Sequence, residues 1–369
     1  MHRAKIPILS ELTPGTTQRH LSKLPGAALA NDEPRPVISV VGAKPGPVLF
    51  VNAGVHGGEY PAVEAVIRLG KTLDPKKISG TVILMPVLNL PAFRTRTPFV
   101  CPIDNVNPNR VFPGDPRGSY SEQMTHALIN EFVIHADAYV DLHGGDIPEA
   151  LVPFVICGAG NDEVPKKSKA MAMAFGLQYV LAVSNPVQPA KGLSSYAAAA
   201  DKGIPAILAE AGGVGQMQEE AVELLVNGVV NVMRHLGMIE SGDNGTAIAS
   251  GEARMTNDET SPKSKIKKTA RRAVATRKAS PADTAASTVL TKFEWLYTKS
   301  TGVWYPKVAP GDIVNKGEQV GTVGDLFGDT LEKVNSPVDG VVLFLTINPS
   351  VIENGLLMGI GAGEVTSDE

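Results

Sequence analysis

Two histidines and one glutamate occur where their side chains could bind the same metal ion. His56 and Glu59 stand three residues apart in the segment His-Gly-Gly-Glu after an apolar run, and His143 follows a second apolar run. Imidazole nitrogen and carboxylate oxygen are good zinc ligands, and two histidines with one carboxylate form a catalytic set that leaves a position open for water. The first segment alone is a weak signal. The second histidine makes a zinc site the better interpretation.

A third apolar run ends in a carboxylate, Glu210, which precedes Ala-Gly-Gly. A carboxylate beside a metal site can act as a general base towards water and as a general acid towards a leaving group. The alternative for Glu210 is a solvated carboxylate at the end of a strand. For His143 the alternative is a histidine satisfied by backbone. Asp141 is either an ordinary turn carboxylate or the partner that orients a ligand.

The loop from residue 96 to 114 is rich in proline and asparagine and contains Arg96 and Arg110. Guanidinium groups bind carboxylates through paired hydrogen bonds, and they stabilise an oxygen that becomes negative in a transition state. We expect Asn109 and Arg110 to bind a substrate carboxylate. Arg96, or less favourably Arg94, is expected to polarise the substrate carbonyl. A structural salt bridge is the alternative for either arginine.

The elements that must position these residues alternate between residues 35 and 236. Short β-branched apolar runs alternate with amphipathic stretches, a pattern that predicts an α/β fold with helices covering a mainly parallel or mixed sheet. The residues that could do chemistry cluster at the C-terminal ends of the apolar runs. Ser119 and Glu122 have the spacing of a helix capping box. The predicted strands are Val37–Val41, Val48–Val55, Val82–Val87, Ala138–Leu142, Val152–Ile156 and Ala206–Ala209, and the predicted helices are Pro61–Thr72, Ser121–Ala136 and Gln216–Leu236.

The size and composition of the chain are typical of a globular protein with two domains. It has 369 residues, 43% of them hydrophobic and 20% charged, enough to bury a substantial core. Its apolar runs are too short to cross a membrane, and its first residues lack the apolar stretch of a signal peptide, so we expect a cytoplasmic protein. The two cysteines, Cys101 and Cys157, have no metal-ligand spacing and are expected to be reduced and buried.

The composition divides the chain into residues 1–240, a linker at 241–287 and a C-terminal part at 288–369. The linker is rich in Ser, Thr, Ala, Gly and Lys and lacks aromatic residues, so it can bury little apolar surface and is predicted to be flexible. Its run from Lys263 to Lys278 holds eight of the 34 basic residues and no acidic one. Such a run could bind nucleic acid, but without aromatic residues for stacking a solvated tether is the better interpretation. We therefore expect no nucleic-acid partner.

The C-terminal part has short apolar runs separated by Gly, Pro, Asp and Asn, which predicts a small all-β domain. It looks like a barrel-sandwich hybrid of the biotinyl or lipoyl type. The carrier lysine of such domains is missing, because the corresponding region reads Gly328-Asp329. We therefore expect this domain to narrow the mouth of the active site or to form an oligomer interface, and the sequence does not decide between the two.

Four motifs together resemble the succinylglutamate desuccinylase/aspartoacylase family of the zinc carboxypeptidase-like superfamily. They are HGGE at 56–59, NPNRVFPG at 107–114, DLHGG at 141–145 and EAGG at 210–213. The resemblance covers about residues 35–240, and the C-terminal part looks like that of longer members. The loop wording is also similar to that of N-acetyl-diaminobutyrate deacetylases. Pro108 departs from the leucine common in related motifs, which stiffens the loop and removes an N–H.

The resemblance implies a zinc carboxypeptidase-like mixed sheet with helices on both faces. It implies one Zn²⁺ per chain held by His56, Glu59 and His143, a catalytic Glu210, and a carboxylate clamp of Asn109 and Arg110. The implied reaction removes an acyl group, acetyl or succinyl, from an N-acyl amino acid by means of a metal-activated water. A carboxypeptidase acting on peptides and a non-catalytic metal-binding protein are the alternatives. The expected partners are the small substrate and, for a homo-oligomer, further copies of the chain, with no membrane.

Overall fold

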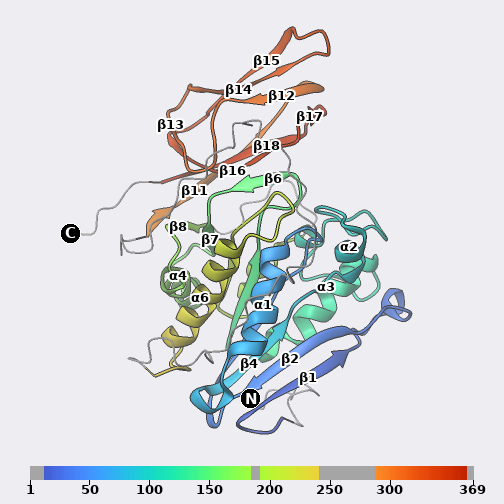
Figure 1. Ribbon diagram of the computed structural model, residues 1–369, viewed down its shortest axis with the longest axis vertical. Helices are drawn as coiled ribbons and strands as arrows, with labels where there is room; N and C mark the ends of the chain where they lie inside the picture. Colours follow the sequence, from blue (N-terminus) through green and yellow to red (C-terminus); the bar gives the residue numbers. More distant parts are fainter. Residues whose placement is uncertain (1–11, 184–191, 241–286, 364–369) are drawn as a thin grey trace, which may run out of the picture.

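One mixed β-sheet forms the centre of the molecule (Figure 1). The computed structural model describes residues 12–183, 192–240 and 287–363. Within them, nine strands make this sheet, and its four central strands β4, β3, β5 and β9 are mutually parallel. In spatial order the strands are β1 (Thr16–Ser22), β2 (Arg35–Val41), β4 (Ser79–Met85), β3 (Lys44–Asn52), β5 (Ala138–His143), β9 (Ala206–Glu210), β7 (Phe154–Cys157), β8 (Tyr179–Ala182) and β10 (Thr288–Leu290).

Helices cover both faces of the sheet, because successive side chains of a strand point to opposite faces. In β3, Leu49 and Val51 lie in one core with α1, α4 and α6, whereas Phe50 lies in a second core with α3 and α5. This arrangement confirms the predicted α/β class and the helices on both faces. The helices are α1 (Tyr60–Thr72), α2 (Leu90–Thr95), α3 (Tyr120–Glu131), α4 (Glu163–Phe175), α5 (Ser195–Asp201) and α6 (Glu219–His235), with 3-10 turns η2 (Ala27–Leu29), η3 (Pro75–Lys77), η4 (Pro108–Arg110) and η5 (Val133–His135).

The predicted elements correspond to observed ones, and the differences lie at their ends. The strand predicted to reach Val55 ends at Asn52, because the chain there leaves the sheet for the loop that carries the first metal motif. The capping box of α3 is confirmed: Ser119 Oγ accepts from the backbone N–H of Glu122, whose side chain accepts from the N–H of Ser119. The strands β1, β8 and β10 and the helices α2, α4 and α5 were not predicted. No helix among the described residues is long and apolar enough to span a membrane.

The C-terminal residues form two further sheets around a common core of buried apolar side chains, without closing into a barrel. The core contains residues of both sheets, among them Trp304, Val323 and Met358. This confirms a β-rich C-terminal region. One sheet contains β11 (Lys292–Tyr297), β18 (Leu356–Ala362), β16 (Gly340–Thr346), β13 (Ile313–Val314) and β6 (Glu149–Leu151), and the other contains β15 (Thr330–Asn335), β14 (Gln319–Gly324), β12 (Gly302–Pro306) and β17 (Ser350–Val351).

Each of the two regions contributes one strand to a sheet of the other where they meet (Figure 1). Strand β6, which follows the second metal motif, pairs with β16 of the C-terminal region, and β10 pairs in parallel with β8 of the large sheet. The backbone N–H of Ile347 also donates to the carbonyl of Pro148 at 2.8 Å. The domain boundary at residue 288 stays a prediction. Strand β10, which begins at that residue, pairs with β8 of the large sheet. The basic run in the predicted linker lies outside the described residues.

Candidate functional site

The three predicted metal ligands come together at the C-terminal ends of β3 and β5. Nδ1 of His56 lies 2.7 Å from Oε1 of Glu59, and Nδ1 of His143 lies 3.1 Å from Oε2 of the same carboxylate. One ligand atom from each residue lies within 4.8 Å of the others, and all three side chains are buried. The donor set and its compactness suit a divalent metal such as zinc.

The far nitrogen of each histidine ring has its own partner. Nε2 of His56 lies 3.1 Å from Oδ1 of Asn107, and Nε2 of His143 lies 2.9 Å from Oδ2 of Asp141. A neutral ring that donates from Nε2 has an unprotonated Nδ1, the state needed to bind a metal. Oδ2 of Asp141 also accepts from the hydroxyl of Ser195. Both rings are therefore held in orientation with Nδ1 directed at Glu59.

The charges of the triad favour an ionised carboxylate. Burial opposes the charged form of Glu59, but His143 and His56 outweigh it and lower the pKa of Glu59 to about 2. Burial likewise opposes the charge of His143, yet Asp141 and Glu59 raise its pKa well above the usual value. Oε2 of Glu59 is buried, and within the described part of the chain it has the ion pair with His143 but no hydrogen bond. A cation bound here would give that oxygen a further partner and would displace the proton of His143.

The two glycines of the first motif are required by close packing. A Cβ on Gly57 would lie 2.3 Å from the carbonyl oxygen of Ala92, and one on Gly58 would lie 2.0 Å from Oδ1 of Asp146. The turn therefore packs tightly between α2 and the chain after β5. Glu59 occupies the N-cap position of α1, but its side chain makes no cap hydrogen bond. It lies between the two histidines instead.

Glu210 lies beside the triad because β9 is the neighbour of β5. The parallel register places Glu210 directly opposite His143. Burial raises the pKa of Glu210 well above its usual value; His143 opposes this shift, and the charges of Glu59 and Glu149 add to it. A positive metal ion at the triad would favour the ionised form. A carboxylate placed here can accept and return a proton near a metal ion.

The predicted carboxylate clamp forms a short 3-10 turn next to the triad. Pro108 is its first residue, where the missing N–H costs nothing, and Oδ1 of Asn107 accepts from the N–H of Asn109 at 2.9 Å. Oδ1 of Asn109 accepts from the N–H of Ser195 at 2.9 Å, which ties the turn to α5. A guanidinium N–H of Arg110 donates to the carbonyl of Asn109 at 2.8 Å.

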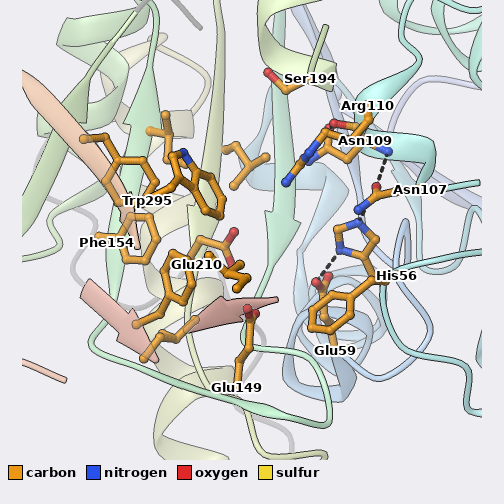
Figure 2. A pocket seen from close by; sticks show the side chains of 18 of the residues that line it. His56, Glu59, Asn107, Asn109, Arg110, Glu149, Phe154, Ser194, Glu210 and Trp295 are labelled. Atoms are coloured by element: carbon orange, nitrogen blue, oxygen red, sulfur yellow. Dashed lines mark hydrogen bonds and ion pairs between the residues drawn. The ribbon is translucent and has the colours of Figure 1, made fainter. Parts of the chain in front are cut away.

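One cavity of about 390 Å³ joins these groups, a size typical of small-molecule sites (Figure 2). Arg110 and His56 face Glu210 across it, and Trp295 borders it on the side of Glu210. The guanidinium carbon of Arg110 lies 5.8 Å from the centre of the Trp295 ring, a cation–π distance. The lining residues are His56, Glu59, Phe99, Asn107, Asn109, Arg110, Gly144, Glu149, Leu151, Phe154, Ile156, Ser194, Tyr196, Leu208, Glu210, Phe293, Trp295, Phe344, Thr346 and Leu356.

Arg96 is not brought to this cavity. It is exposed, ends α2 in the left-handed conformation with φ of 56°, and is absent from the residues that line the cavity. Arg94 is exposed as well and forms an ion pair with Glu33. Their arrangement gives no support to the prediction that one of them polarises the substrate carbonyl. Arg110 is the arginine that lines the cavity.

Sequence reasoning missed several residues of the site. Asn107 stood inside a quoted motif, so its place behind His56 could have been suspected. Glu149 and Trp295 had no local signal, because a lone glutamate or tryptophan reaches a cavity only through the pairing of distant strands. Burial and the charges of Glu59 and Asp146 raise the pKa of Glu149 to about 8, and Arg110 opposes this shift.

The arrangement can bind a metal ion, hold an anion at Arg110 and transfer a proton at Glu210 within one partly apolar cavity. These three capacities suit the metal-assisted hydrolysis of a small anionic substrate.

Comparison with known proteins points to the same class of enzyme. Residues 45–236 match the family model described as the succinylglutamate desuccinylase/aspartoacylase catalytic domain. The N-alpha-acetyl-L-2,4-diaminobutyric acid deacetylase of Halomonas elongata is 31% identical over 204 residues. That match covers 55% of this chain and 58% of the deacetylase, so the chain spans less than two thirds of that relative.

Solved structures share the fold over nearly the whole chain. A succinylglutamate desuccinylase/aspartoacylase from Rhodobacter sphaeroides has a TM-score of 0.73 and 24% identity, covering 97% of this chain and 98% of its own. The product-bound ectoine utilization protein EutE (DoeB) from Ruegeria pomeroyi also has a TM-score of 0.73, with 20% identity and coverages of 96% and 98%. Because these coverages exceed 95%, the likeness in fold includes the C-terminal region.

Proposed function

The chain belongs to the succinylglutamate desuccinylase/aspartoacylase family, and from this premise we propose that it is a zinc-dependent hydrolase of N-acyl amino acids. The reaction cleaves the linear amide bond of an N-acetyl or N-succinyl amino acid and yields a carboxylic acid and a free amine. The observation that carries the proposal is the common cavity, which His56 and Glu59 of the triad line together with Glu210 and Arg110.

We propose that His56, Glu59 and His143 hold one Zn²⁺ per chain through Nδ1 of each histidine and the carboxylate of Glu59. Bound there, zinc would act as a Lewis acid that polarises the acyl carbonyl and lowers the pKa of water. Asn107 and Asp141 keep the two rings in the orientation and tautomer that binding requires.

Glu210 moves the proton in the proposed reaction. Its carboxylate takes a proton from the attacking water as the new carbon–oxygen bond forms, and it passes that proton to the leaving nitrogen as the carbon–nitrogen bond breaks. Its position opposite His143 supports this role. Glu210 has no place among the proposed metal ligands, so proton transfer and metal binding can be separated by mutation.

Arg110 binds the substrate carboxylate and thereby places the acyl group. Its guanidinium lies partly buried in the cavity, and burial lowers its pKa while Tyr297, Glu149 and Glu210 oppose that shift. A fixed cation in such a place gains from an anionic ligand. Asn109 holds the turn that carries Arg110 against α5. The cytoplasmic location and assembly into a homo-oligomer are further proposals from the sequence.

The cavity supports a small substrate over a peptide. Aromatic side chains of the C-terminal region, among them Phe293 and Trp295, form one wall of a space of about 390 Å³. An extended peptide would need a longer groove, whereas an amino acid with a short acyl group suits a cavity of this volume.

The test measures release of primary amine from N-acetyl, N-succinyl and N-formyl amino acids and from short peptides. The panel includes Nα-acetyl-L-2,4-diaminobutyric acid, the compound named for the Halomonas relative. Zinc-loaded protein is compared with the same protein after chelation. The proposal expects chelator-sensitive release from at least one acylated amino acid. Cleavage of peptides alone would favour a carboxypeptidase, and zinc binding without any cleavage would favour a non-catalytic protein.

A further inference from the structure

One carboxylate in the cavity has no role in the proposed reaction. Glu149 is the first residue of β6 and lines the cavity with His56, Glu59 and Glu210. In Figure 2 its carboxylate points into the space between Glu210 and the side of His56 and Glu59. It is not one of the three ligand atoms that lie within 4.8 Å of one another. Its chemistry is therefore available to a substrate.

The backbone holds Glu149 firmly in this place. Its carbonyl oxygen accepts from the N–H of Val214 at 2.8 Å, and its strand pairs with β16, where Glu149 lies opposite Thr346. Side chains are excluded on both sides: a Cβ on Gly145 or on Gly213 would lie 2.6 Å or 2.4 Å from that carbonyl oxygen. The backbone of Glu149 is thus anchored where the large sheet and the C-terminal region meet.

The charge of Glu149 lacks a partner side chain. Among the described residues, no side chain forms a hydrogen bond or ion pair with it; the backbone of Asp146 supplies a hydrogen bond, and Arg110 is the cation that lowers its pKa. Much of the wall is apolar, with Phe154, Leu151 and Phe344. An ionised carboxylate in such surroundings is costly unless a cation accompanies it.

With zinc and the substrate carboxylate bound, the other charges of the site would balance without Glu149. The two positive charges of the proposed zinc are offset by Glu59 and Glu210, and Arg110 is offset by the carboxylate of the substrate. When Glu149 is ionised, its negative charge then has no counterpart among the described side chains that line the cavity. A substrate that carries one ammonium group would complete the balance.

We propose that Glu149 binds the side-chain ammonium group of the substrate, so that the enzyme prefers N-acyl amino acids with an amino group at the end of the side chain. This inference rests on the proposed function and names the amino acid on which the same site acts. Glu149 is a specificity residue here, and bond cleavage does not depend on it. The preference arises because a neutral or acidic side chain leaves the partly buried carboxylate unpaired or repelled.

The kinetic test uses isosteric pairs of substrates. Nα-acetyl-2,4-diaminobutyrate is compared with N-acetylnorvaline, in which a methyl group replaces the ammonium, and Nα-acetylornithine is compared with N-acetylnorleucine. We expect wild-type kcat/KM to be about 100-fold higher for the cationic member, mainly through KM. In Glu149→Gln the preference should fall to within about threefold of unity, because kcat/KM for the cationic member falls. Glu64→Gln, whose side chain lies on α1 outside the cavity, is the matched control and should keep the wild-type preference.

A binding measurement gives a readout that does not depend on turnover. Calorimetry on zinc-loaded Glu210→Gln, which should not consume the substrate, is compared with the Glu149→Gln/Glu210→Gln double variant. Affinity for Nα-acetyl-2,4-diaminobutyrate should fall about 100-fold in the double variant, and affinity for N-acetylnorvaline should not. Equal affinities in both proteins, or a wild-type preference for the neutral member, would overturn the inference. Hydrolysis of neutral substrates without a cationic preference sinks only this inference, whereas hydrolysis of none of the compounds sinks the proposed function too.

Discussion

The residues before position 241 and those after position 287 line the same cavity with different kinds of side chain. Among the described residues that line it, the first group supplies every charged side chain, including His56, Arg110 and Glu210. The second group supplies apolar and hydroxyl side chains, from three neighbouring strands of one sheet: Phe293, Trp295, Phe344, Thr346 and Leu356. The metal ligands and Glu210 thus lie at strand ends of the large sheet, whereas β11, β16 and β18 supply uncharged side chains of the cavity wall.

The difference follows from the way each region fixes the positions of its side chains. Adjacent parallel strands end at the same edge of a sheet, so ligands and proton carriers on them are fixed relative to one another. The strands β11 and β16 turn alternate side chains to one face, where Phe293, Trp295 and Phe344 pack with ring centres 5.0 to 6.1 Å apart. Changes to the metal ligands and Glu210 should therefore affect kcat or metal binding, whereas changes in the second group should affect KM.

The largest expected effect comes from Glu210→Gln. Removing the proton carrier should lower kcat by about 10³-fold, within the range of about 10²- to 10⁴-fold for general acid–base groups. The zinc content per chain, measured by elemental analysis, should stay at the wild-type level because the side chain is not a proposed ligand. Loss of zinc from this variant would contradict the separation of proton transfer from metal binding.

Asp141→Asn should come next. It weakens the partner of His143 Nε2, and loss of such outer partners lowers metal affinity by about 10- to 100-fold. Competition with a chromogenic chelator measures the affinity. Asp201→Asn, an exposed residue at the end of α5, is the matched control and should bind zinc like the wild type. Unchanged affinity in Asp141→Asn would mean that the ring is held by other contacts.

Trp295→Ala tests the second region. It removes an aromatic wall and a cation–π contact worth about 0.5–2 kcal/mol, so KM should increase about tenfold while kcat stays within about threefold. Steady-state kinetics on an acylated amino acid separate the two constants. Tyr305→Ala, in the other C-terminal sheet and half exposed, should leave both unchanged. A large fall in kcat with an unchanged KM would contradict the claim that the C-terminal region acts on substrate binding alone.

Arg96→Ala should have the smallest effect. The side chain is exposed and does not line the cavity, and surface substitutions of this kind change free energies by about 0.5 kcal/mol or less. We expect kcat and KM to stay within about twofold of the wild type. A loss of more than tenfold in kcat would restore Arg96 to the role in carbonyl polarisation that the sequence predicts.

The sequence was informative where function depends on strand ends. The segments around His56, His143 and Glu210 each followed an apolar run, so parallel pairing could be expected to bring them to one edge. The sheet, its helices on both faces and the β-rich C-terminal region could be predicted for the same reason. The loop residues indicated the clamp at Asn109 and Arg110, and the family resemblance strengthened that prediction.

The remainder depends on contacts between distant segments. The pairing of β6 with β16 places Glu149 in the cavity, and no local pattern indicates that pairing because β6 has only three residues. Trp295 lies more than a hundred residues beyond Arg110, whose guanidinium it faces. Arg96 illustrates the opposite case: the loop composition suggested an anion site, but the left-handed end of α2 leaves its side chain exposed.

The central claim is that a single metal ion at His56, Glu59 and His143 supports hydrolysis of an N-acyl amino acid. Its most direct test titrates zinc into the chelator-treated protein while release of primary amine from the best substrate of the panel is followed. Amine release should rise linearly and reach its plateau at one zinc per chain, and His143→Ala should show no such rise at these zinc concentrations. Full activity in the chelated protein, or equal activation of His143→Ala by zinc, would contradict the account.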